Sequence, residues 1–433
     1  MSPDHLPAVP GREPTVSVVV PALNEGPNLE LLLPAVRATL DELGLPHEIL
    51  IVTRDIDDET AHAAQVVGAR VLVQQERGYG GALLAGFSAA RGAYVITMDA
   101  DLSHPAEFIR GLWAARHDGE VVIASRYVAG GSADMPVSRY VLSKVLNRVF
   151  SRGLSLRIKD MSSGFRLFDA RIVRGLPLRA RDFNVVQDIL VKAYAGGWRV
   201  REVPFHYEPR KHGASHARVL KFGIAYIRTF RSLWRLRNSI DCADYEDRAY
   251  ESSIPLQRYW QHARLRHVTD LARECGPVLD VGCGSSHILA QLPAGSIGLD
   301  LSPAKLRCAR QFGRPLVHAT ATALPFAADT FPGVVCSQVI EQLLPQQPIF
   351  DELCRVLRPG GRLIIGTLDH ARWEWRTLES IYAAMAPSGC VAKHVSRYTR
   401  RDVIDALARH GLRLEAERHI LGSELILAFR KPA

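Results

Sequence analysis

Two carboxylates stand two residues apart at the end of an apolar stretch: Asp99 and Asp101 follow Ala93–Met98. A stretch of this composition predicts a strand buried in a sheet, so both acids are expected at a strand end. Carboxylates placed in this way can bind Mg²⁺ or Mn²⁺ and leave positions open for diphosphate oxygens. The cation would offset the charge that develops on a departing nucleotide diphosphate. The alternative is a solvated acidic turn, and the buried strand before the pair favours the metal site.

A second cluster of chemistry-bearing residues lies far along the chain. The turn Gly282–Gly284 follows the predicted strand Pro277–Val281, and the next predicted strand, Ile297–Leu301, contains Asp300, twenty residues after Asp280. Glycines let the backbone approach a ligand, and an acid on the second strand can accept from a pair of ribose hydroxyls. The pattern predicts an adenosine-bearing cofactor, with a dinucleotide as the alternative.

Alternating strands and helices must position the first cluster. The polar groups Asn24–Glu25, Asp55–Asp58 and Asp99–Asp101 each follow a predicted strand, and ligands on parallel α/β sheets bind beyond these strand ends. The predicted strands are Val16–Pro21, Glu48–Val52, Arg70–Gln74 and Ala93–Met98, and the predicted helices are Leu29–Leu43, Thr60–Val67 and Ala82–Ala90.

Length and composition predict a globular chain of two domains. The 433 residues exceed what one core usually holds, and 47% of them are hydrophobic. The net charge of +9 is compatible with anionic partners. All seven cysteines lie at or after Cys242 without metal-ligand spacing, which favours a reducing cytosol. We expect no signal peptide and no membrane-spanning segment, because no apolar run approaches about 20 residues.

The first half resembles a known family in several ordered motifs. VVVPALNEGPNLELLL, ERGYGGALLAGFSAARGAYVITMDADLSHP, IASRY and DMSSGFRLFDA, between about Val16 and Ser239, are similar to family-2, GT-A-fold glycosyltransferases. Within that family they resemble the dolichol- or polyprenyl-phosphate sugar synthases. The resemblance implies transfer of a sugar, with inversion, from a nucleotide donor to a lipid phosphate. Ser103 departs from the family pattern, in which a glutamine is common at this position.

The same resemblance implies roles for individual residues. Asp99 and Asp101 would lie at the metal and the diphosphate. Residues implied in the nucleotide-sugar pocket are Pro21, Asn24 and Glu25, with Asp55 as a candidate in place of the acids that usually follow the second strand. Residues implied at the acceptor phosphate are Arg126, Arg139 and Ser143. A guanidinium fork suits a phosphate, which gives both arginines a physical role.

The identity of the acceptor decides whether a general base is needed. A sugar hydroxyl would need one, and Asp160 or Asp188 could serve. A lipid phosphate is already ionised at neutral pH and needs none.

Residues 218–238 predict a basic amphipathic helix, with an apolar and aromatic side opposite a basic one. Such a helix is typical of a membrane interface. The alternative is a helix that packs its apolar side on the protein itself. A nucleic-acid partner is disfavoured, because the apolar side is continuous rather than made of isolated stacking aromatics. The basic residues are Arg218, Lys221, Arg228, Arg231 and Arg235.

The second half resembles class I S-adenosylmethionine-dependent methyltransferases from about Tyr245 onward, in LDVGCG, GLDLSPAKL, ATALPFAADTF and VLRPGGRLIIGT. The usual Glu-His-Leu after the fourth strand reads Glu341-Gln342-Leu343, so a candidate histidine base is absent. The resemblance implies that S-adenosylmethionine is held by Asp280, Gly282, Gly284, Asp300 and Leu301.

These patterns predict a fusion of two α/β domains, a GT-A fold followed by a Rossmann-like methyltransferase fold. We expect a bifunctional enzyme at the cytoplasmic face of the membrane, peripherally bound, that glycosylates a polyprenyl phosphate and methylates a substrate of the same pathway. The alternatives are a noncatalytic or scaffolding second domain, or a hydroxyl acceptor on a cell-surface glycan. The expected segments are a flexible N-terminus at 1–14, a glycosyltransferase domain at 15–217, the basic helix at 218–238, a linker at 239–253 and a methyltransferase domain at 254–433.

Overall fold

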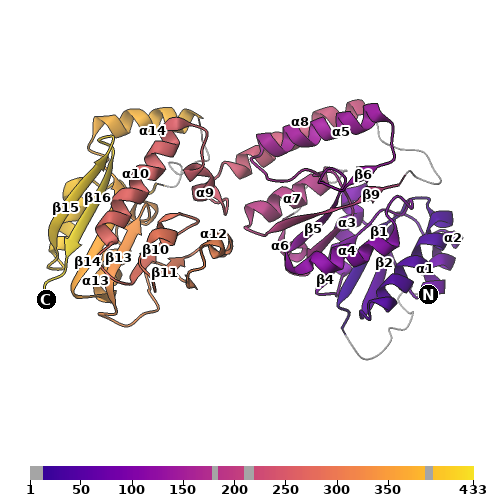
Figure 1. Ribbon diagram of the computed structural model, residues 1–433, viewed down its shortest axis with the longest axis horizontal. Coiled ribbons are helices and arrows are strands. Elements are labelled where there is room, and N and C mark those ends of the chain that lie inside the picture. Colours follow the sequence, from indigo (N-terminus) through magenta and orange to yellow (C-terminus); the bar gives the residue numbers. More distant parts are fainter. Residues whose placement is uncertain (1–12, 178–183, 209–218, 386–393) are drawn as a thin grey trace. The chain divides into compact units, whose positions relative to one another are not determined.

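The computed structural model describes residues 13–177, 184–208, 219–385 and 394–433, with side chains described except at 219–227 and 381–385. The predicted flexible N-terminus lies outside these residues apart from its last two. The chain forms two compact units, residues 1–194 with 198–234 and residues 195–197 with 235–433. Each is an α/β unit, which confirms the predicted fold class (Figure 1).

The first unit is built on a seven-stranded sheet in the order β3-β2-β1-β4-β7-β5-β8. Strands β1, β2, β3 and β4 are parallel, as predicted, because helical crossovers join them. Strand β7 runs antiparallel between β4 and β5, so the sheet is mixed rather than wholly parallel. Its strands are β1 (Val16–Pro21), β2 (His47–Thr53), β3 (Arg70–Val73), β4 (Tyr94–Thr97), β5 (Val121–Ser125), β7 (Arg166–Asp169) and β8 (Val200–Pro204). Strands β6 (Ser132–Ala133) and β9 (His206–Tyr207) pair with each other in a separate two-stranded sheet.

Helices cover both faces of this sheet (Figure 1). Helices α1, α2 and α4 pack on one apolar face, and α3, α6 and α7 on the other, where Phe150 of α5 and Leu233 of α8 also lie. The helices are α1 (Gly26–Glu42), α2 (Asp58–Val67), α3 (Tyr79–Ala89), α4 (Ile109–Ala114), α5 (Val137–Gly153), α6 (Ala170–Gly175), α7 (Val185–Ala195) and α8 (Val219–Arg237).

The second unit has a seven-stranded sheet in the order β12-β11-β10-β13-β14-β16-β15. Its strands are parallel except for β16, which pairs antiparallel with β14 and β15. The strands are β10 (Val278–Val281), β11 (Ile297–Asp300), β12 (Leu316–His318), β13 (Phe331–Ser337), β14 (Leu357–Leu368), β15 (Arg413–Ile420) and β16 (Glu424–Arg430).

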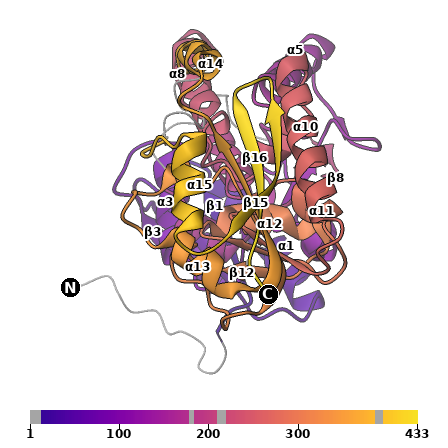
Figure 2. The ribbon, with the colours of Figure 1, turned by 90° about the vertical axis from the view of Figure 1, so that its left-hand side faces the viewer.

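Two apolar layers enclose this second sheet. Helices α10 and α11 pack on one face, and α13 and α15 on the other, as Figure 2 shows. The stretch 239–253, predicted as a linker, contains the short helix α9 and belongs to the second compact unit. The helices are α9 (Tyr245–Tyr250), α10 (Pro255–Ala272), α11 (Ile288–Gln291), α12 (Pro303–Ala309), α13 (Ile349–Val356), α14 (Trp373–Met385) and α15 (Arg400–Ala408).

Candidate functional site

The strand ends β1, β2 and β4 bring the predicted donor residues to one edge of the first sheet. Pro21 ends β1 beside Val52 of β2, and the polar residues follow directly. Asn24 adopts a left-handed backbone (φ 58°), which asparagine tolerates better than most residues. The side chain of Glu25 accepts a hydrogen bond from Asn28, and exposed Asp55 accepts one from Arg54 Nε at 2.6 Å.

Asp99 and Asp101 follow β4 at the same edge but lie in different surroundings. The side chain of Asp99 is 32% exposed, whereas Asp101 is buried. Asp101 Oδ1 accepts hydrogen bonds from the backbone N–H and the hydroxyl of Ser103 (3.1 and 2.5 Å). Ser103, which stands in place of the more usual glutamine, therefore orients this carboxylate.

Two further side chains, which the sequence patterns did not single out, hold Asp99. The Tyr79 hydroxyl donates to Asp99 Oδ1 at 3.0 Å, and the His104 Nε2 atom lies 3.9 Å from Oδ2. Burial and the charge of Asp99 raise the pKa of Tyr79, which stays protonated and donates. Burial lowers the pKa of His104, and its Nδ1 accepts from the Asp99 N–H, so the ring proton of neutral His104 lies on Nε2. The proximity of His104 to the acidic pair in sequence is the signal that could have identified it.

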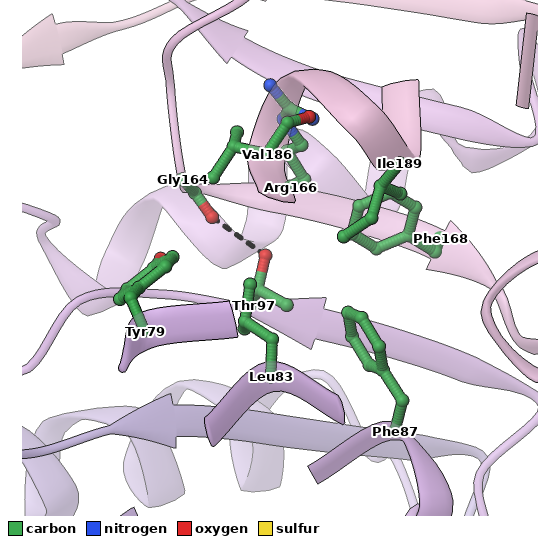
Figure 3. A pocket seen from close by; sticks show the side chains of 9 residues that line it. All are labelled: Tyr79, Leu83, Phe87, Thr97, Gly164, Arg166, Phe168, Val186 and Ile189. Atoms are coloured by element: carbon green, nitrogen blue, oxygen red, sulfur yellow. Dashed lines mark hydrogen bonds between the residues drawn. The ribbon is translucent and has the colours of Figure 1, made fainter. Parts of the chain in front are cut away.

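A small pocket lies behind Tyr79, between α3, β4, β7 and α7 (Figure 3). Its polar wall is formed by Thr97, which donates to the Gly164 carbonyl at 2.7 Å, and by the buried Arg166. Arg166 donates to the carbonyls of Met161 and Val186 (2.8 and 2.6 Å), so it ties the segment before β7 to α7. The remaining lining is apolar, which makes this pocket a support of the site rather than a place for a sugar.

The two carboxylates considered as bases are both held in ion pairs. Asp160 is fully buried and receives Nε and Nη2 of Arg126, each at 2.8 Å. Burial alone would raise the pKa of Asp160. The hydrogen bonds from Arg126 nevertheless hold this pKa below its usual range. Asp188 Oδ2 lies 2.8 Å from Lys192 Nζ on α7. This pairing favours a positioning role for both acids.

The candidate acceptor residues lie on α5 and on the segment that follows β5. Arg126 Nη2 also donates to Ser162 Oγ at 2.7 Å, and the Tyr127 hydroxyl donates to Ser143 Oγ at 2.7 Å. Within the described residues, Arg126 Nη1 takes part in no hydrogen bond, so it remains available to a phosphate. Arg139 is exposed on α5, one turn before Ser143.

In the second unit, the glycine turn has the geometry that the sequence predicts. Gly282 and Gly284 both have positive φ (73° and 54°), and a Cβ on Gly282 would lie 2.2 Å from Val339 Cγ2. Asp300 accepts from the N–H groups of Gly284 and Ser302 (2.9 and 2.7 Å), which braces the turn. Asp300 therefore shapes the turn, and its role at a ribose stays a prediction.

Asp280 supplies a direct test of whether a cationic cofactor fits. Its carboxylate is buried, and Oδ2 has no hydrogen-bond partner among the described residues. Burial, with the charge of Asp300, raises the pKa of Asp280 to about 7. A cationic amino group would pair with this oxygen, so the residues present fit S-adenosylmethionine. Leu301 is exposed beside the turn.

Helix α9 adds residues to the glycine turn that the linker prediction missed. Glu246 accepts from the Ser285 hydroxyl at 2.8 Å and forms an ion pair with Lys305. Asp247 lies 2.7 Å from His287 Nε2. The acidic residues that suggested a linker therefore pair with polar and basic side chains at and beside the glycine turn.

Comparisons with known proteins agree with both halves. Residues 17–176 match glycosyl transferase family 2, and residues 279–365 match a methyltransferase domain. The dolichol-phosphate mannosyltransferase of Pyrococcus furiosus is 35% identical over 52% of this chain and 65% of its own length. The dolichol-phosphate mannosyltransferase of Mycosarcoma maydis is 33% identical over 52% of this chain and 80% of its own.

Among solved structures, a SAM-dependent methyltransferase from Thermotoga maritima is 18% identical and covers 42% of this chain and 98% of its own, with a TM-score of 0.33. The predicted resemblances of both halves are confirmed. The chain belongs to glycosyl transferase family 2 through its first half, and residues 279–365 of its second half match a methyltransferase domain.

Proposed function

We propose that this protein transfers a sugar, with inversion, from a nucleotide-sugar to a polyprenyl phosphate and methylates a substrate of the same pathway with S-adenosylmethionine. The observation that carries the first activity is that Asp99, Asp101 and Arg126 all act electrostatically on His104, which agrees with one site for the diphosphate and the acceptor. Relatives named as dolichol-phosphate mannosyltransferases support the acceptor class. Pro21, Asn24, Glu25 and Asp55 would hold the nucleotide-sugar.

The chain's own residues account for most of the proposed sugar transfer. Asp99 and Asp101 would hold Mg²⁺ or Mn²⁺, which supplies positive charge to the leaving diphosphate when bound. Tyr79, His104 and Ser103 fix the orientation of these carboxylates. Arg126 Nη1, Arg139 and Ser143 would hold the acceptor phosphate, which is already ionised. The ion pairs of Asp160 and Asp188 agree with an acceptor that needs no base.

The mass of the product tests the proposal. The full chain is incubated with undecaprenyl phosphate, a nucleotide-sugar panel, Mn²⁺ and S-adenosylmethionine, and lipid products are analysed by mass spectrometry. We expect a lipid phosphate carrying one hexose with any accepted donor, and S-adenosylhomocysteine in the same reaction when the methyl acceptor is present. Sugar transfer to water or to added glycans alone would contradict the lipid acceptor.

An exposed apolar stripe on α5 supports a peripheral membrane position. Six aliphatic side chains are 45–77% exposed on this helix, which contains no acidic residue. The basic residues of α5 are also exposed, and each adds about 1 kcal/mol of attraction to an anionic membrane surface. Arg139 and Ser143 share this helix, so a lipid phosphate would meet them at the surface. The aliphatic residues are Val137, Val141, Leu142, Val145, Leu146 and Val149.

The described part of α8 has both packed and exposed apolar side chains, and Trp234 is 39% exposed. Phe230 packs against Phe150 of α5 with ring centroids 5.0 Å apart, and Leu233 is buried in the core. The alternative interpretation, a helix packed on the protein's own surface, fits these residues. Arg228, Arg231 and Arg235 remain exposed.

In the described residues no helix is long and apolar enough to cross a bilayer.

Charges placed in the α5 stripe are expected to release the protein from membranes. Val141→Asp with Val145→Asp should weaken binding to phosphatidylglycerol vesicles at least about tenfold, because each carboxylate opposes both burial and the anionic surface. Flotation of the full chain with vesicles measures this binding. Val66→Asp on α2, where the valine is also exposed, is the matched control and should leave binding unchanged. Equal flotation of all three proteins would contradict a membrane role for α5.

A further inference from the structure

A cluster of polar side chains with inaccessible, unpaired atoms lies in the second unit outside the glycine turn. Glu341 and Trp375 are buried, and His370, Glu374 and His394 are partly exposed. Five of its atoms have no hydrogen-bond partner in the described part of the chain: Glu341 Oε1, His370 Nε2, Glu374 Oε2, Trp375 Nε1 and His394 Nδ1. Buried polar atoms are nearly always paired in folded proteins. Five unpaired atoms in one region therefore indicate a ligand site.

Ring contacts and hydrogen bonds bring these residues together. The ring of Trp375 lies 6.1 Å from that of His370 and 6.4 Å from that of His394, between centroids. The N–H groups of Val395 and Ser396 donate to the Glu341 carbonyl (2.9 and 3.1 Å), so the segment that carries His394 lies against the segment that carries Glu341. Three separate elements of the unit thus meet at one place.

The cluster lies at the sheet edge where a methyl donor would bind. Cys336 of β13 pairs with Val281 of β10, the residue before the glycine turn. Val339, which contacts Gly282, is two residues before Glu341. Thr367, near the end of β14, donates to Glu341 Oε2 at 3.3 Å. These residues place the cluster beyond the carboxyl ends of β13 and β14, where ligands of such sheets bind.

The charges around Glu341 disfavour an anionic ligand. Arg264, whose positive charge acts on Glu341, is engaged by Glu424 through two hydrogen bonds of 2.6 and 2.8 Å. Glu341 is fully buried, and burial together with the charge of Glu424 raises its pKa to about 7. Burial lowers the pKa of His394 to about 4, so this ring is neutral at pH 7. A phosphate or carboxylate would face Glu341 and Glu374, whereas the nearby guanidinium groups are already paired, Arg264 with Glu424 and Arg397 with Glu379.

The unpaired atoms also distinguish among neutral and cationic ligands. Trp375 Nε1 can only donate, and ionised Glu341 can only accept. A hydroxyl satisfies both at once, whereas an ammonium group cannot accept from the indole. The five unpaired atoms can be paired by several hydroxyls, which a sugar offers in one molecule.

We propose that this cluster is the methyl-acceptor site, that the acceptor is a hydroxyl of a neutral sugar, and that Glu341 is its general base. The inference rests on the methyl transfer proposed above. The hydroxyl proton passes to Glu341 Oε1 as the oxygen bonds to the methyl carbon, the carbon–sulfur bond breaks, and its electron pair stays on sulfur. Solvent then removes the proton from Glu341. Glu341, the first residue of the Glu-Gln-Leu sequence, would thus act as the general base in place of the missing histidine.

Binding and turnover of neutral glycosides test the inference on the full chain. Octyl glucoside, mannoside and galactoside are titrated by calorimetry, with and without S-adenosylmethionine, and S-adenosylhomocysteine formation is measured. We expect at least one glycoside to bind and to be methylated, with kcat rising about tenfold per pH unit up to about pH 7. Glu341→Gln should lower kcat at least about 10²-fold, remove the pH dependence and leave both dissociation constants within twofold.

Two further variants separate the base from the fold. Trp375→Phe keeps the apolar ring and removes the donor, so it should weaken glycoside binding about tenfold or more without changing S-adenosylmethionine affinity. Glu417→Gln, a surface carboxylate paired with Arg400, is the matched control and should behave as the unmodified chain.

The outcomes separate this inference from the proposed function. Binding of S-adenosylmethionine without binding or methylation of any glycoside would overturn the sugar site and leave the methyltransferase intact. Full activity in Glu341→Gln would overturn its role as base. An absence of S-adenosylmethionine binding would instead overturn the proposed methyl transfer.

Discussion

Replacing Asp99 and Asp101 together by alanine is expected to lower the rate of sugar transfer at least about 10³-fold, or about 4 kcal/mol of transition-state stabilisation. Both carboxylates follow the carboxyl end of β4, where Tyr79, His104 and Ser103 contact the segment that carries them. Without the two acids, the metal and the diphosphate lose their common anchor. Initial rates with Mn²⁺ and a nucleotide-sugar measure the effect.

A second readout keeps this prediction independent of turnover. Mn²⁺ binding, followed by electron paramagnetic resonance in the presence of nucleoside diphosphate, should be lost in the same variant. Asp118→Ala, which removes an exposed carboxylate from the same unit, is the matched control and should retain both metal binding and transfer. Wild-type rates in the double variant would eliminate the metal role of this pair.

Asp160→Asn is expected to destabilise the first unit by about 3–5 kcal/mol, because it leaves the guanidinium of Arg126 without its counter-ion. Arg126 is only 13% exposed and depends on Asp160 for both Nε and Nη2. A urea titration of the full chain measures the free energy of unfolding. Glu42→Gln, which breaks the exposed pair with Arg110, should change it by no more than about 0.5 kcal/mol.

The same pair predicts how stability depends on pH. The folded pKa of Asp160 is lowered, so its ionised form contributes stability above the unfolded pKa, about 4, and this contribution is lost as the pH falls through the folded pKa. The difference between Asp160→Asn and the unmodified chain should therefore shrink below about pH 4. If Asp160→Asn destabilised the protein equally at low pH, the charge of Asp160 would not be the source of its contribution to stability.

The sequence was sufficient for the strand-end chemistry. Alternating apolar runs and helical stretches predict parallel strands, and parallel strands gather the residues that follow them at one edge. For this reason Asn24, Asp55 and Asp99, which are far apart along the chain, could be predicted from the sequence to follow strands at one sheet edge. The glycine turn and Asp300 were predictable in the same way, since a short local motif fixes their geometry.

Contacts between distant segments could not be predicted in this way. Asp160 was a candidate base by residue type, and only the structure shows that its carboxylate is paired with Arg126, thirty-four positions away. The acidic stretch around Glu246 suggested a linker by composition, yet it packs on Ser285. Composition describes what a segment could do in water, whereas its partners decide what it does in the fold.

What the sequence determined by itself was the pair of folds, their order and the strand-end residues of each, because periodicity and short motifs are local properties. What only the tertiary structure decided was the state of the side chains. Burial raises the pKa of Glu341, and its Oε1 atom has no hydrogen-bond partner among the described residues. The segments that carry Glu341 and His394 lie together only when distant elements pack at one sheet edge. The sequence showed only that the histidine is missing, whereas the fold identifies Glu341 as a candidate base.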